Sequence, residues 1–112
     1  MADCIAAIST PMASGGVSMI RISGTDALTV AAKVFTPKYP AHDIEKMDGY
    51  TAAYGDIAAD GAKLDDGVLL IFRAPHSYTG ENTAEITCHG GIHVTRRVLQ
   101  AVLAAGARMA QA

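Results

Sequence analysis

The chain has 112 residues, of which half are apolar and 18% are charged, so it can build one packed domain but not two. Its 9 Lys and Arg residues against 11 Asp and Glu residues give a formal charge of −2. That balance argues against a strong nucleic-acid footprint, which usually appears as an excess of basic residues. No window approaches the roughly 18 apolar residues of a membrane span, and the N-terminus lacks the pattern of a signal peptide, so we expect a cytoplasmic protein without a membrane partner.

The first half of the chain is predicted to hold two strands and one helix. Residues 3–10 are apolar and compatible with a strand, and residues 17–23 are rich in branched side chains. The loop 11–16 between them contains a proline and paired glycines. In residues 23–35 the apolar positions recur at i, i+3, i+4 and i+7, which predicts a helix. Residues 36–49 contain two prolines, and their apolar residues show no helical or strand periodicity, which indicates a connecting loop.

The second half is predicted to hold three strands and a second helix. Residues 50–58 and 65–75 read as two strands joined by a turn. The run at 68–72, "VLLIF", is apolar on both faces, which predicts a central strand covered on both sides. Residues 82–89 alternate between apolar and polar side chains, and residues 93–106 form a helical stripe that stops at a glycine.

These elements predict the α+β class, with one mixed β-sheet of about five strands and two main helices packed on it. Strands outnumber helices, and two strands follow each other without a helix between them. We expect residues 1–112 to form a single domain.

Cys88 and His89 are the first candidates for chemistry. Adjacent residues on a strand point to opposite faces, so this pair cannot easily form a nucleophilic dyad. Cys88 shares its face with Ala84 and Ile86, which favours a core cysteine. A zinc site that used Cys88, His89 and His93 would lack the paired spacing of four ligands. We therefore expect no metal site and no catalytic residue, and a thiol enzyme using Cys88 stays an alternative.

Glu85 and Arg21 are harder to explain as structural residues. Each is a charged side chain in the middle of a short apolar strand, where such residues are disfavoured. One interpretation is that the two side chains form a structural ion pair, or that each simply faces solvent. The other is a pocket for a polar heteroaromatic ligand, in which the carboxylate accepts two parallel N–H bonds and the guanidinium binds a carbonyl or carboxylate. The pattern alone leaves both open.

Two segments carry a family resemblance: "IAAISTPMASGGVSMIRISG" (5–24) and "SYTGENTAEITCHGG" (77–91). Together they resemble the N-terminus of the MnmE/TrmE tRNA-modification GTPases. The family pattern runs from an Ile-Ala start through a Gly-Gly turn and R-I-S-G to T-G-E and H-G-G. Both blocks occur in this order, and they frame almost the whole chain.

The resemblance implies a folate-binding domain that forms a homodimer and is similar in fold to the folate-binding T-protein of glycine cleavage. It implies that Arg21 and Glu85 contact a tetrahydrofolate derivative, in the 5-formyl or methylene form. In the family, a helical domain with an inserted GTPase follows, and GTP, Mg²⁺ and K⁺ belong there. The complete protein is thought to act with an FAD-containing MnmG/GidA-type subunit on the wobble uridine of certain tRNAs, where the folate supplies a one-carbon unit to carbon 5.

The chain departs from the family pattern at a few positions. Ala13 and Ser14 stand where the family often has Gly and a basic residue, and Asn82 replaces the usual Asp. A downstream lysine that contacts folate in the family has no counterpart here, and neither does the phosphate-binding loop. The chain alone is therefore expected neither to hydrolyse GTP nor to modify tRNA. A purely structural self-association domain remains a further alternative.

Overall fold

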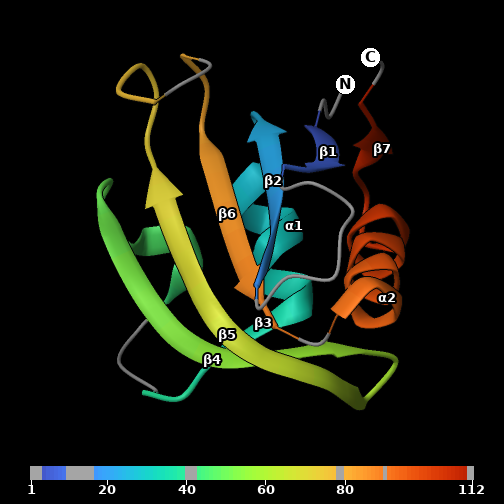
Figure 1. The fold of residues 1–112 in the computed structure, drawn as a ribbon. Helices are drawn as coiled ribbons and strands as arrows, with labels where there is room; N and C mark the ends of the chain where they lie inside the picture. The colour runs from blue at the N-terminus through green and yellow to red at the C-terminus, as the bar shows by residue number, and fades with distance from the viewer. Residues whose placement is uncertain (1–3, 10–16, 40–42, 78–79, 90, 111–112) are drawn as a thin grey trace.

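One mixed β-sheet with two helices on its inner face makes up the fold, which confirms the predicted α+β class (Figure 1). The computed structural model describes residues 4–9, 17–39, 43–77, 80–89 and 91–110. The helices are α1 (Ala27–Val34) and α2 (Gly91–Ala104), with a short 3-10 helix η1 (Ile44–Lys46). The strands are β1 (Cys4–Ile8), β2 (Ser18–Gly24), β3 (Phe35–Pro37), β4 (Thr51–Ala59), β5 (Ala62–Phe72), β6 (Thr83–Cys88) and β7 (Arg108–Met109).

The sheet of the described residues has seven strands, not about five, in the order β3-β4-β5-β6-β2-β1-β7. Neighbouring strands are antiparallel except β1 and β7, which are parallel. The five longer strands and both helices were predicted, and the two short strands at the sheet edges were missed. Two or three residues are too few to show a period, and Pro37 is tolerated in β3 because that strand lies at an edge.

Alternating side chains on the central strands build the core against the helices. Ile86 in β6 lies between Ile20 in β2 and Leu69 in β5, and all three are fully buried. Ala84 and Cys88 point to the same inner face, as the alternation predicted. Burying each large aliphatic side chain is worth about 1.5–3 kcal/mol, so this inner layer supplies most of the driving force for folding.

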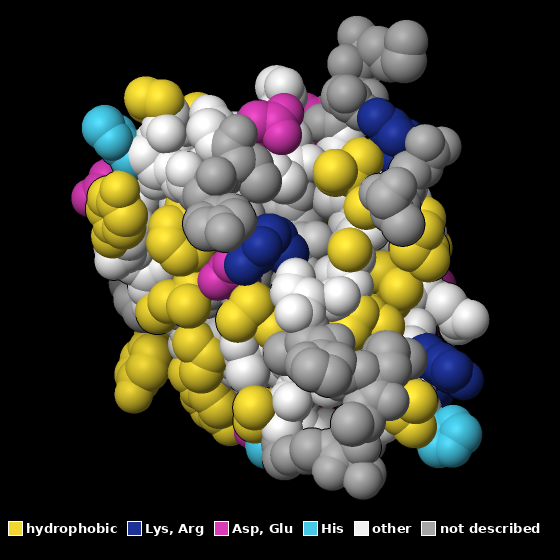
Figure 2. Space-filling view, turned by 45° about the horizontal axis from the view of Figure 1, so that its top comes forward, with side chains coloured by type: hydrophobic (Ala, Val, Ile, Leu, Met, Phe, Trp, Pro, Cys, Tyr) yellow, Lys and Arg dark blue, Asp and Glu magenta, His cyan; other side chains and the backbone are white. Residues whose placement is uncertain are grey.

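The outer face of β5 corrects one prediction. Leu69 and Ile71 are buried on the inner face, but Val68 on the outer face is 39% exposed and Leu70 is only partly buried. The strand is central, yet the described residues cover only one of its sides. Figure 2 shows hydrophobic side chains gathered on this uncovered side.

Two paired glycines let the long β4–β5 hairpin fit between its neighbours. Gly55 and Gly67 lie opposite each other, and a Cβ at either position would come within 2.2 or 2.0 Å of a backbone oxygen, of Thr36 and Thr87 respectively. Glycine is required here by close approach of the neighbouring strands. The far end of the hairpin curves beneath α2 (Figure 1).

Within the described part of the chain, no helix has both the length and the apolar character needed to cross a membrane.

The close approach at Gly67 gives a stability prediction. Gly67→Ala should lower the free energy of unfolding by about 3 kcal/mol, because the new methyl group meets the Thr87 carbonyl of β6. Urea denaturation followed by circular dichroism measures the change. Gly61→Ala is the control, since Gly61 has φ +78° but no atom within 4 Å of the added carbon. It should cost only about 1 kcal/mol of backbone strain, and an equal loss in both variants would contradict the steric explanation.

Candidate functional site

A recess of about 380 Å³ opens on the outer face of the sheet and contains both residues singled out from the sequence. Its volume falls within the range of about 300–1,000 Å³ that small-molecule sites occupy. The lining residues are Arg21, Tyr50, Phe72, Pro75, His76, Ser77, Thr83 and Glu85.

Arg21 and Glu85 form an ion pair on the floor of this recess. They lie directly opposite each other in the antiparallel register of β2 and β6. Arg21 donates from Nε to Oε2 of Glu85 at 2.8 Å, and Nη2 lies 2.7 Å from the same oxygen. The side chain of Glu85 is 10% exposed and that of Arg21 is 32% exposed. The strands thus bring together two residues that are 64 positions apart in the chain.

One oxygen of Glu85 remains available to a ligand. Both nitrogens of Arg21 contact Oε2, and no described residue donates a hydrogen bond to Oε1. A carboxylate that is this deeply buried needs donors to offset the loss of hydration. Glu85 therefore presents an acceptor to N–H groups of any molecule in the recess.

Two aromatic rings form a wall of the same recess. The rings of Tyr50 and Phe72 meet edge to face, with centroids 6.0 Å apart and planes at 89°. The backbone N–H of Tyr50 donates to the carbonyl of Ile71 at 2.7 Å, which fixes Tyr50 in a conformation with φ 61°. These rings were not singled out from the sequence, because an aromatic residue at a strand end carries no signal of the face it joins.

Arg73 braces the segment that leads to Tyr50. Its guanidinium donates to the carbonyl of Met47 from Nε at 3.0 Å and from Nη2 at 2.7 Å, and to the carbonyl of Glu45 at 2.8 Å. The connection between η1 and β4 is thereby tied to the end of β5.

Asn82 holds the loop on the other side of the recess. Its Oδ1 accepts a hydrogen bond from the backbone N–H of Ala74 at 2.8 Å, and its carbonyl accepts one from Gly24 at 3.0 Å. The oxygen of an Asp could accept the first bond equally well, so the departure from the family pattern keeps this contact. The other departure, at Ala13 and Ser14, lies outside the described residues, as does the loop 11–16.

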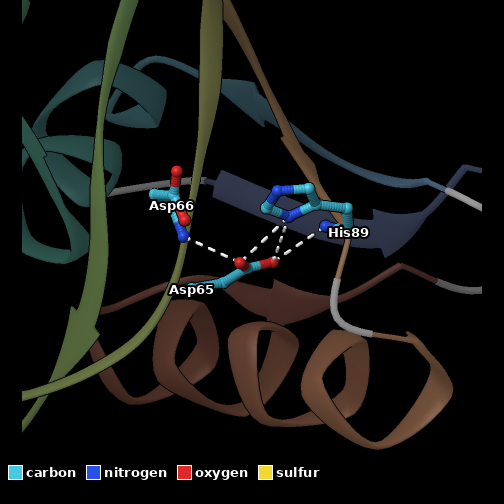
Figure 3. Close-up of side chains that lie close together, drawn as sticks. All are labelled: Asp65, Asp66 and His89. Carbon is cyan, nitrogen blue, oxygen red and sulfur yellow. Dashed lines mark hydrogen bonds and ion pairs between the residues drawn. The ribbon is translucent and has the colours of Figure 1, made fainter.

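A second polar cluster joins β5 to the end of β6 (Figure 3). Oδ2 of Asp65 accepts the backbone N–H of His89 at 2.8 Å, and Nδ1 of His89 lies 3.0 Å from Oδ1. Oδ1 also accepts the N–H of Asp66 at 2.8 Å. The hydrogen bond to Asp65 and the charge of that carboxylate raise the pKa of His89. Burial pushes the pKa of Asp65 upward, but the hydrogen bonds from His89 outweigh it and leave the pKa below its usual value.

This cluster is better described as an ion pair than as a metal centre. Ligand atoms of Asp65, Asp66 and His89 lie within 4.8 Å of one another. Both oxygens of Asp65 are nevertheless engaged by N–H groups or the imidazole, and Tyr54 donates its hydroxyl hydrogen to Asp66. The pair was not predicted, because its members are 24 residues apart in the chain.

Cys88 is placed as the sequence predicted for a core residue. It is 1% exposed, and its Sγ lies 3.9 Å from Oγ1 of Thr95 in α2. Burial raises the pKa of the thiol, which disfavours the nucleophilic thiolate. His89 is exposed and bonded to Asp65, so the geometry gives the thiol-enzyme alternative no support.

Comparison with known proteins gives a consistent result over nearly the whole chain. The family model described as "GTP-binding protein TrmE N-terminus" matches residues 4–112. The chain is 48% identical over 109 residues to the tRNA modification GTPase MnmE of Lachnoclostridium phytofermentans, covering 97% of this chain and 24% of that protein. It is 51% identical over 109 residues to the MnmE of Protochlamydia amoebophila, covering 96% of this chain and 23% of that protein. The chain thus spans about a quarter of the length of these curated relatives.

The ion pair in Figure 3 should make stability depend on pH. The pKa of His89 is raised above its usual value of 6.5. The charged imidazole therefore stabilises the fold fully below pH 6.5, and this contribution is lost as the pH rises through the raised pKa. The lowered pKa of Asp65 means that its contribution is lost as the pH falls below about 4. Urea unfolding from pH 5 to 8 should show the decline at the upper end, and His89→Gln should reduce it. His93→Gln, at an exposed histidine of α2, is the control, and an equal effect of both changes would contradict this assignment.

Proposed function

The chain belongs to the family of GTP-binding protein TrmE N-termini, and from this membership we propose that it is the folate-binding and self-association domain of a tRNA-modifying GTPase. The ligand is a tetrahydrofolate derivative in the 5-formyl or methylene form. The residues that hold it are Arg21 and Glu85.

The observation that carries the folate proposal is the unused oxygen of Glu85. A reduced pterin offers a ring N–H next to an exocyclic amino group, and a carboxylate is the acceptor that suits this pair of donors. Oε1 of Glu85 has no partner among the described residues, and Oε2 is held in place by Arg21. The recess thus offers the buried oxygen Oε1 to one donor of the pterin edge, and the second donor would reach Oε2 if Arg21 released one of its two contacts with that oxygen.

The walls of the recess support the same ligand. Tyr50 and Phe72 offer apolar ring surface to a flat heterocycle, and aromatic contacts of this kind contribute about 0.5–1.5 kcal/mol beyond buried area. When bound, the folate would supply a one-carbon unit. The residues of this chain would bind and orient the ring, and no residue here is assigned a catalytic role.

The activity of the whole protein extends this proposal. The relatives are named tRNA modification GTPases, and three quarters of their length lies outside the match. We place GTP, Mg²⁺ and K⁺ binding in that remaining part. The proposed reaction modifies carbon 5 of the wobble uridine in tRNA, in the cytoplasm, together with an FAD-containing MnmG/GidA-type subunit.

The apolar outer face of the sheet supports self-association as a homodimer. Val68 and Tyr54 are paired across β5 and β4 on this face and are 39% and 46% exposed. An uncovered apolar face on a central strand favours contact with another surface. A second copy of this domain is the occupant we propose, since each copy presents the same face.

Calorimetry with 5-formyltetrahydrofolate tests the ligand. The chain should bind it, and Arg21→Ala or Glu85→Ala should each weaken binding more than about fivefold, which corresponds to the loss of about 1 kcal/mol for a charge-assisted contact. Asp60→Asn is a matched control, because Asp60 is exposed at the hairpin tip, outside the recess. A chain extended to the length of its relatives serves as a second sample. Absence of heat from both chains, with circular dichroism showing them folded, would overturn the proposal.

Sedimentation velocity tests the homodimer. Val68→Asp adds a charge to the exposed outer face and should shift the chain from dimer toward monomer, because a buried unpaired carboxylate is costly. Met109→Asp is the control at an exposed hydrophobic residue of the edge strand β7 and should leave the dimer intact. A monomeric wild-type chain at high micromolar concentration would exclude self-association through this domain alone.

A further inference from the structure

Helix α2 presents a basic surface that the folate recess does not use. Its exposed polar side chains recur at i, i+3, i+4 and i+7, so they lie along one face of the helix. The opposite face carries Val98 and Val102, which are fully buried in the core. The helix sequence, "GIHVTRRVLQAVLA", contains no acidic residue. The residues of this basic face are His93, Arg96, Arg97 and Gln100.

The two arginines of the basic face differ from the other basic residues of the chain. Neither Arg96 nor Arg97 forms a hydrogen bond or ion pair with any residue that the structure describes, and both are exposed. Every other lysine or arginine has a partner. These partnered residues are Arg21, Lys33, Lys38, Lys46, Lys63, Arg73 and Arg108. The bonds of Lys33 and Arg73 go to neutral carbonyls, so a partner does not always mean a neutralised charge. Arg96 and Arg97 are nevertheless the two adjacent cations whose donors no described residue engages.

A hollow of about 590 Å³ borders the basic face and carries a further cation on its wall. It lies between α2, the end of α1 and the far part of the β4–β5 hairpin. Arg97 and Gln100 line it from α2, and Lys33 lines it from α1. Asp60 is the one acid among its lining residues, and much of the remaining surface is alanine. Positively charged side chains therefore line the hollow from two helices, Arg97 from α2 and Lys33 from α1.

We propose that the basic face of α2, with Lys33 across the hollow, contacts the phosphate backbone of tRNA. This inference rests on the proposed function, which makes tRNA the substrate of the whole protein. A guanidinium presents a planar fork of donors that matches phosphate oxygens, and such contacts position an RNA without reading its sequence. The role of this face is to orient the body of the tRNA.

The composition of the basic face favours RNA over an acidic protein partner. Protein interfaces usually centre on buried apolar or aromatic anchors. The large hydrophobic residues that are exposed in the described chain are Val17, Tyr39, Tyr50, Tyr54, Val68 and Met109, and α2 contains none of them. A polar surface with unpartnered arginines and no apolar anchor is suited to phosphates. It also lies on a helix that packs against the inner face of the sheet, whereas the folate recess opens on the outer face.

Salt-dependent binding of fluorescently labelled tRNA, followed by anisotropy from 50 to 200 mM KCl, tests the contact. Each phosphate contact contributes a slope of about 0.7–0.9 to the fall of log K with log salt concentration. The double variant Arg96→Gln/Arg97→Gln removes two such contacts and should therefore weaken binding at low salt and reduce the slope by about 1.4–1.8. The control is Lys38→Gln/Lys46→Gln, which removes the same charge from ion-paired residues outside α2. This control should bind tRNA like the wild type.

The outcomes separate this inference from the folate proposal. Calorimetry with 5-formyltetrahydrofolate on the α2 double variant should give the wild-type affinity, because the recess is untouched. Failure of the wild type to bind folate, with tRNA binding that depends on Arg96 and Arg97, would remove the folate proposal alone. No tRNA binding by the wild type at 50 mM KCl, or equal weakening in the α2 and control variants, would overturn the tRNA contact. So would a double variant that binds tRNA normally but loses binding to polyglutamate, since that result indicates an acidic protein partner.

Discussion

The antiparallel pairing of β2 with β6 is the constraint on which the site depends. This register sets Arg21 opposite Glu85, so a cation and an anion from distant parts of the chain share one recess. Such a pair is weak evidence for stability, because the desolvation of both charges offsets much of their attraction. Removing one partner alone is expensive, about 3–5 kcal/mol in buried examples. A pair that adds little stability, and whose Oε1 has no partner among the described residues, is consistent with the ligand-binding role proposed for it.

The sequence predicted the environment of side chains on the inner face of the sheet better than on the outer face. Burial of Ala84, Ile86 and Cys88 followed from alternation, because a period of two reports which residues share a face. Alternation also showed that Glu85 is an unusual residue for the middle of an apolar strand, but it could not identify the residue opposite Glu85 on the neighbouring strand. Register between β2 and β6 is set by contacts 64 residues apart, and no local pattern encodes it. For the same reason the pairing of Asp65 with His89 had no sequence signal.

The incorrect prediction for β5 is informative about the function. The run at 68–72 has the composition of a strand buried on both faces, yet the outer face carries a partly exposed Val68. The described residues belong to one copy of one domain, and they cover only the inner side of this strand. The mismatch is what self-association on that face would produce. The edge strands β3 and β7 were missed for a simpler reason, since so few residues cannot display a period.

The bonds made by Arg73 have an energetic consequence for ligand capture. Three donor contacts to the carbonyls of Met47 and Glu45 anchor the approach to Tyr50 before any ligand arrives. Ordering a mobile wall on binding would subtract about 0.5–1.5 kcal/mol for each side chain immobilised. A wall that is stiffened in advance avoids this entropic penalty, so a modest set of polar contacts can suffice to retain a small heterocycle.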